Sequence, residues 1–137
     1  MPPVLPINYL AVLAATVAQM VVGFLWYSPL LFGKTWMKLM NLKENEMKKG
    51  NMASSMGLMF LFTLLLTYVL AHFIGYVGAK TFMGGAVTGL WVWLGFVVTT
   101  SAASSIFEKK PWRLYFLNNG HYLVNLVVGG GILAVWP

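Results

Sequence analysis

The sequence contains no cysteine and no aspartate, and charged residues make up only 9% of its 137 positions. The absence of cysteine excludes disulfides and thiolate metal sites. Soluble domains are roughly a quarter charged, so this chain has too little charge to cover a surface that faces water. Its three acidic residues, Glu44, Glu46 and Glu108, all lie in polar connections between apolar segments.

Hydrophobic residues, in contrast, make up 59% of the chain, and its mean hydropathy is +0.76. Segments of about 20 apolar residues can cross the hydrocarbon core of a bilayer as helices. The first such run, Tyr9 to Leu25, lacks a preceding basic region and is too long for the apolar part of a signal peptide. The sequence therefore predicts an all-α membrane protein, a single domain over residues 1–137. The four predicted transmembrane helices cover residues 8–28, 52–77, 81–106 and 112–135.

A short amphipathic segment, residues 30–41, follows the first predicted span. Its apolar side chains fall on one face at helical spacing, and its polar side chains fall on the other. The apolar face comprises Phe32, Trp36, Leu39 and Met40, and the polar face comprises Lys34, Lys38 and Asn41. Such a segment beside a span normally lies in the headgroup plane. We expect an interfacial helix anchored by Trp36, Lys34 and Lys38; a loop with a chance pattern is the alternative.

The distribution of basic residues predicts the orientation. Five of the nine Lys and Arg residues lie within 30–50, three lie within 107–113, and one, Lys80, lies in the second connection. The positive-inside rule makes the first two segments cytoplasmic and leaves both termini outside. This is the arrangement of a multi-pass membrane protein, and the family resemblance given next implies that the membrane is the cell inner membrane. Because basic residues flank apolar segments, the net charge of +6 indicates contact with anionic lipid headgroups rather than nucleic acid.

Four short segments resemble a known family. They are W-Y-S-P-L-L-F-G-K at 26–34, F-V-V-T-T-S at 96–101, N-Y-L-A-V at 8–12 and F-E-x-x-P at 107–111. Together they resemble a family of small bacterial inner-membrane proteins that is classified as a domain of unknown function. The resemblance implies four spans and a prokaryotic envelope, but no activity, cofactor or catalytic residue. His121 stands where the family pattern has a Gly-Tyr pairing, so it is not treated as a family residue.

No catalytic residue, cofactor or metal site is predicted, and an enzyme is the least favoured class. No predicted span contains an acidic residue, which argues against a proton-coupled exchanger. No serine lies in a G-x-S-x-G sequence. His72 and His121 would lie roughly 10 Å or more apart in depth, so a haem held by both is not expected.

Two pairs of small residues, Ala11 with Ala15 and Gly85 with Gly89, recur four positions apart within predicted spans. Small residues at this spacing let helices approach closely. The contact can join two copies of the chain or two helices of one copy. This pattern favours a structural or interaction subunit that packs with itself, as a homo-oligomer, or with a membrane partner.

A polar cluster in the inner half of the membrane favours a different class, a bundle that binds or conducts a small molecule or ion. On the last span, polar side chains at spacings of three, four and seven residues share one face. Unpaired amides in hydrocarbon are costly, so this face should point into the bundle. A hydrogen-bond network that only fixes helix packing is the alternative. The predicted cluster comprises Gln19, Thr99, Thr100, Asn118, His121, Tyr122 and Asn125.

Overall fold

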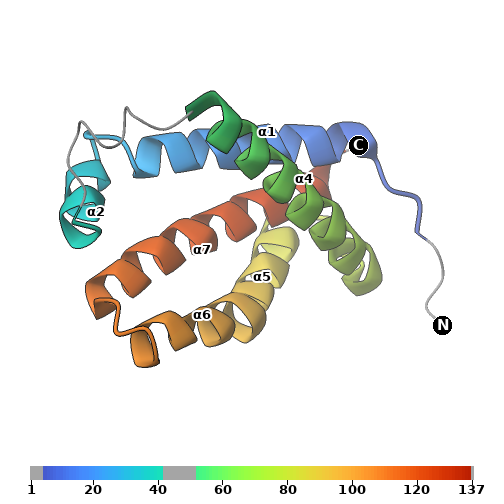
Figure 1. Cartoon of the computed structure of the whole chain (residues 1–137). Helices are drawn as coiled ribbons and strands as arrows, with labels where there is room; N and C mark the ends of the chain where they lie inside the picture. Colours follow the sequence, from blue (N-terminus) through green and yellow to red (C-terminus); the bar gives the residue numbers. More distant parts are fainter. Residues whose placement is uncertain (1–4, 42–51, 137) are drawn as a thin grey trace.

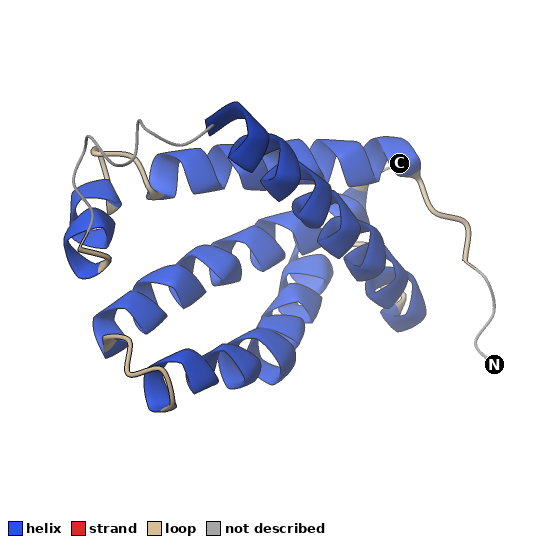
Figure 2. Cartoon of the chain, viewed as in Figure 1, coloured by secondary structure: helices blue, strands red, loops and turns tan. Residues whose placement is uncertain are grey.

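A computed structural model describes residues 5–41 and 52–136. Every element within these ranges is a helix, which confirms the predicted class (Figures 1 and 2). The elements are α1 (Tyr9–Trp26), α2 (Gly33–Leu39), α4 (Met52–Val77), α5 (Phe82–Val92), the π-helix η1 (Trp93–Val97), α6 (Val98–Ile106) and α7 (Trp112–Val135). The segment 42–51, which contains three of the five basic residues of the predicted connection 30–50, lies outside the described residues.

Each predicted span corresponds to one long helix, with α5, η1 and α6 continuous over 82–106. Asn8 caps α1, because its side-chain Oδ1 accepts hydrogen bonds from the backbone N–H groups of Leu10 and Ala11 at 3.0 and 3.1 Å. Within the described ranges, three helices are long and apolar enough to cross a membrane: Tyr9–Trp26, Ala53–Val77 and Phe82–Ile106. These three helices indicate a membrane protein.

Helix α7 is the exception to the four predicted apolar spans. Its 24 residues are long enough to cross a bilayer, at about 1.5 Å per residue. However, Arg113 and a series of amide and imidazole side chains make it too polar to meet the criterion that the other three satisfy. Three of the four predicted spans are therefore long and apolar enough to cross a membrane, and a crossing by α7 stays a prediction.

The polarity of α7 is explained by its position in the fold. It packs against every other described element, and many of its side chains are buried, including Asn119, His121 and Asn125. In Figure 1 it runs through the middle of the molecule between α1 and α5. A helix that is surrounded by protein need not present apolar side chains to lipid, and its polar groups can be used inside the bundle.

The closest helix contact joins α5 to α7 through glycine. A Cβ atom on Gly85 would overlap the Gly130 carbonyl, and one on Gly89 would overlap the Leu126 carbonyl. Ala11 and Ala15 of α1 are also buried within the chain. The small-residue pairs that the sequence analysis identified thus lie at contacts inside one copy of the chain.

The W-Y-S-P segment ties the end of α1 to α7. The Trp26 indole N–H donates to the Leu117 carbonyl at 3.1 Å, and the Tyr27 hydroxyl donates to Asn118 Oδ1 at 2.7 Å. The chain then reverses at Ser28, whose carbonyl accepts from Gly33 N–H at 2.9 Å. This turn places α2 at the end of the bundle where α6 connects to α7.

Helix α2 is shorter than the predicted interfacial helix, covering Gly33–Leu39 rather than 30–41. Trp36 is half-buried, with its ring edge-on to Tyr27 at 5.6 Å between centroids, whereas Lys34 and Lys38 are exposed. Figure 1 places α2 and the α6–α7 connection at one end of the molecule and both termini at the other. The two described basic connections are therefore on the same side.

Candidate functional site

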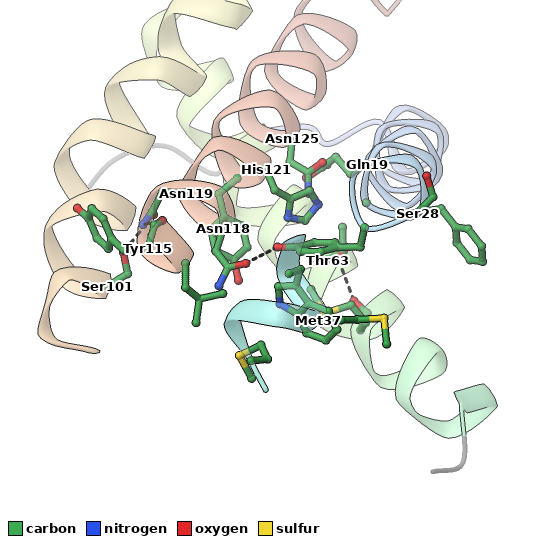
Figure 3. Close-up of a pocket in the computed structure, with 18 of the residues that line it drawn as sticks. Gln19, Ser28, Met37, Thr63, Ser101, Tyr115, Asn118, Asn119, His121 and Asn125 are labelled. Atoms are coloured by element: carbon green, nitrogen blue, oxygen red, sulfur yellow. Dashed lines mark hydrogen bonds between the residues drawn. The ribbon is translucent and has the colours of Figure 1, made fainter. Parts of the chain in front are cut away.

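A cavity of about 890 Å³ lies between α1, α2, α4, α6 and α7 (Figure 3). Its walls are largely apolar, and several methionines contribute to them. The polar lining comes mainly from α7, with further contributions from Gln19 of α1 and from serines of α6. The apolar lining includes Met20, Phe24, Met37, Met40, Met56, Met59 and Leu114, and the polar lining includes Gln19, Tyr27, Ser101, Ser105, Asn118, Asn119, His121, Tyr122 and Asn125.

Five members of the predicted polar cluster line this cavity: Gln19, Asn118, His121, Tyr122 and Asn125. The structure does not bring Thr99 and Thr100 there. Both are exposed, and their hydroxyls donate back to carbonyls of their own helix, those of Gly95 and Phe96.

The π-helix accounts for the position of the two threonines. The face that contacts α7 continues from Gly89 at every fourth residue, through Trp93, Val97, Ser101 and Ser105. In an α-helix this spacing drifts by about 40° per step around the axis. The wider π turn compensates for the drift, so Ser101 rather than Thr100 faces the bundle. No residue pattern in the sequence marked this change of helix type.

Gln19 is held in one orientation by its neighbours. Its side-chain Nε2 donates to the Ala15 carbonyl at 3.1 Å and to Thr67 Oγ1 at 2.7 Å. The Thr67 hydroxyl uses its own proton on the Thr63 carbonyl at 2.7 Å, so it can only accept from Gln19. Because both neighbours are acceptors, the amide nitrogen must face them. The amide oxygen Oε1 is left without a hydrogen-bond partner among the described residues.

His121 and Asn125 form a pair one turn apart on α7. Asn125 Nδ2 and His121 Nε2 are 3.2 Å apart, and both side chains are buried. The imidazole is surrounded by the rings of Trp26, Tyr27 and Tyr122, with centroid distances of 6.2, 5.1 and 5.4 Å. This aromatic cage fixes the imidazole plane and leaves Nδ1 and Asn125 Oδ1 as the free polar atoms of the pair.

Four buried side-chain atoms in the described part of the chain have no hydrogen-bond partner there: Gln19 Oε1, His121 Nδ1, Asn125 Oδ1 and Ser105 Oγ. All four residues line the cavity. Buried polar groups without partners are rare, because each lost hydrogen bond costs about 1–3 kcal/mol. These four atoms are closed to water in the structure, so their residues leave hydrogen-bonding capacity unused beside the cavity.

By contrast, a second group of polar side chains beside the cavity has hydrogen-bond partners within the protein. Ser101 Oγ donates to Asn119 Oδ1 at 3.1 Å, and Asn119 Nδ2 donates to the Tyr115 carbonyl at 2.8 Å. The Trp93 indole N–H donates to the Asn119 carbonyl at 2.8 Å. The bonds from Ser101 and Trp93 join the 82–106 helix to α7, and the third lies within α7; together they form a network that fixes helix packing. Sequence reasoning missed Ser101, Ser105 and Asn119; the spacing of Asn119 from Asn118 placed it on another face.

Among the described residues that line the cavity, Lys110 alone carries a formal charge. Its side chain is 51% exposed, and its Nζ lies 3.6 Å from the Glu108 carboxylate. The charged group of Lys110 is therefore at the protein surface. His72 lies elsewhere on α4, where its Nδ1 is 2.9 Å from the Tyr68 carbonyl. No three His, Cys, Asp or Glu side chains within 5–41 and 52–136 are grouped so as to hold a metal ion. The cavity therefore offers neutral hydrogen-bonding groups on an apolar wall.

A family model described as "Protein of unknown function (DUF1761)" matches residues 10–134, nearly the full length of the chain. No curated protein and no solved structure matches. The matched range contains every residue that lines the cavity.

Proposed function

This chain belongs to the DUF1761 family of proteins of unknown function, and we propose from its cavity that it is a membrane protein that binds a small molecule between its helices. The observation that carries the proposal is the set of buried polar atoms without partners at Gln19, His121, Asn125 and Ser105. These atoms lie just behind the cavity wall, and small rotations of their side chains would let a bound molecule with its own hydrogen-bonding groups satisfy them. The cavity volume of about 890 Å³ is within the range of small-molecule sites.

A role as a structural or interaction subunit has less support from the fold. The small-residue pairs that favoured self-association, Ala11 with Ala15 and Gly85 with Gly89, are already occupied by contacts within one chain. They offer no surface to a second copy. A purely structural polar network would also be expected to pair its buried atoms, as the Ser101 and Asn119 network does.

The membrane arrangement that we propose has four spans, with α7 as the protein-surrounded fourth, and both termini outside. Its support is the burial of α7, the charge distribution and the common end shared by α2 and the α6–α7 connection. In this arrangement α2 lies at the cytoplasmic surface of the inner membrane.

Cysteine labelling tests this topology, and the natural absence of cysteine provides a clean background. Lys38→Cys and Lys80→Cys place single thiols at exposed positions in the first and second connections. An impermeant maleimide added to spheroplasts is expected to label the Lys80→Cys protein and not the Lys38→Cys protein. External labelling of Lys38→Cys would overturn the orientation.

Gln19→Leu tests the binding proposal itself. Leucine keeps much of the volume but removes Oε1, and the Thr67 hydroxyl retains its bond to Thr63. The two hydrogen bonds that Gln19 Nε2 donates are lost, so we expect a loss of stability of about 1–2 kcal/mol. Extraction and mass spectrometry of the purified protein should show a roughly tenfold loss of bound small molecule, equivalent to about 1.4 kcal/mol of binding.

Thr99→Val is the matched control, since it also replaces a polar side chain but lies outside the cavity. It should leave both the bound molecule and the melting temperature unchanged. If Gln19→Leu prevents folding, the cavity residues form a structural network and the binding proposal fails. An equal content of bound molecule in the wild type and in Gln19→Leu would count against it as well.

A further inference from the structure

We propose that the molecule bound in the cavity is an uncharged amphiphile, with a head group that carries both a hydrogen-bond donor and an acceptor on a hydrocarbon chain. The inference rests on the proposed function and specifies its ligand class. It combines three properties of the cavity: the donor and acceptor pattern of its buried atoms, the position of its charge, and the composition of its walls.

The three polar groups on α1 and α7 are brought together by the register of the two helices. A Cβ atom on Gly129 would lie 2.8 Å from Gln19 Nε2, and one on Gly23 would lie 3.0 Å from His121 Nε2. Asn125 is one helical turn from Gly129 and one turn from His121. Along the helix axes it therefore lies between the positions of Gln19 and Gly23 on α1. Figure 3 shows the side chains of Gln19, His121 and Asn125 converging from the two helices.

These groups present both kinds of hydrogen-bonding atom. Gln19 Oε1 is an acceptor, because the neighbours of Gln19 fix its amide. If Asn125 Nδ2 donates to His121 Nε2, then His121 Nδ1 carries a proton and Asn125 Oδ1 accepts. If the amide and the tautomer are both reversed, Nδ1 accepts and the amide nitrogen donates. Either assignment leaves one hydrogen-bond donor and one acceptor on the pair of His121 and Asn125. A head group that carries both an acceptor and a donor can therefore pair with them.

Within residues 5–41 and 52–136, the buried end of the cavity holds no charge to pair with a charged head group. The formally charged Lys110 is half-exposed and lies beside Glu108. Burial of an ion away from water is unfavourable unless a counter-charge compensates it. Neutral amides and an imidazole are therefore suited to hydroxyl, ester or amide head groups rather than to carboxylates, phosphates or ammonium ions.

The rest of the wall is suited to a flexible hydrocarbon chain. Methionines from three helices line it, including Met20 of α1, Met37 of α2, and Met56 and Met59 of α4. Methionine side chains are unbranched and adaptable, and they accommodate apolar groups of varied shape. Small polar solutes without a tail would leave this surface unoccupied, so the walls favour an amphiphile over a simple polar molecule.

The test uses three probes with ten-carbon chains and different heads: 1-decanoylglycerol, decanoate and decyltrimethylammonium. Glycerol serves as the head group without a tail. Native mass spectrometry of the purified full-length protein in detergent measures the bound fraction of each. We expect decanoylglycerol to bind at a roughly tenfold lower concentration than either charged probe, and glycerol not to bind. Gln19→Leu and the near-isosteric Gln19→Met should each weaken decanoylglycerol binding by roughly tenfold.

Other outcomes separate this inference from the proposed function. If a charged probe binds best and Gln19→Met weakens it, the cavity is a binding site and only the uncharged class is wrong. If no probe binds and no molecule co-purifies, both proposals fail. Glycerol binding as tightly as decanoylglycerol would overturn the requirement for a hydrocarbon chain.

The same measurements identify the source of the bound molecule. An uncharged lipid that co-purifies without added probe identifies a resident membrane lipid as the source, whereas decanoylglycerol binding only on addition identifies a free amphiphile. Either result supports the uncharged class.

Discussion

Gly89→Leu is expected to abolish the folded bundle or to destabilise it by about 3 kcal/mol or more, at the upper end of the range for overpacked cores. Even a single Cβ atom at Gly89 would overlap the Leu126 carbonyl of α7. That neighbour is backbone, which cannot rotate away as a side chain can. The contact between α5 and α7 would have to open, and α7 packs against all other described elements. Thermal unfolding in detergent measures the loss.

Gly57→Leu provides the matched control for this variant. A Cβ atom at Gly57 of α4 would have nothing within 4 Å, and leucine favours a helix over glycine by roughly 0.5–1 kcal/mol. The control should therefore be as stable as the wild type or slightly more stable. Similar melting temperatures for Gly89→Leu and Gly57→Leu would show that the close helix contact is not required.

Trp26→Ala is expected to destabilise the protein by about 3–5 kcal/mol, the usual range for truncating a large aromatic side chain in a packed site. The Trp26 ring packs on Phe32 at 4.6 Å and lies beside His121, and its N–H bonds to the Leu117 carbonyl. Its loss would free the end of α1 from α7 and remove part of the cage around the imidazole. Unfolding monitored by circular dichroism gives the magnitude.

Two further variants separate packing from hydrogen bonding at this position. Trp26→Phe keeps an aromatic ring but loses the N–H, and it should cost less than Trp26→Ala, since one hydrogen bond contributes about 1 kcal/mol. Trp91→Ala removes a tryptophan whose side chain is 68% exposed, so little packing within the chain is lost. If Trp91→Ala were as damaging as Trp26→Ala, the proposed role of Trp26 as a link between α1 and α7 would be wrong.

The helical class and the helix positions could be predicted from the sequence, because both depend on local properties. Asn8 marks the start of α1 by capping its first turn, and Pro111 stands directly before α7. Long apolar runs set the lengths of α1, α4 and the 82–106 helix. The shared face of Asn118, His121, Tyr122 and Asn125 also followed from helical spacing alone. For that reason most of the predicted polar cluster lies at the cavity.

Features that depend on how helices pack could be known only from the tertiary structure. The sequence shows glycine pairs, but not whether Gly85 and Gly89 meet another copy or α7 of the same chain. A π turn changes helical phase without a residue signature, and it placed Ser101 rather than Thr100 toward the bundle. The free oxygen of Gln19 is likewise set by Thr67, 48 residues further along the chain. Local spacing determines which face a side chain occupies, whereas contacts between distant segments determine what that face meets and which polar atoms stay unpaired.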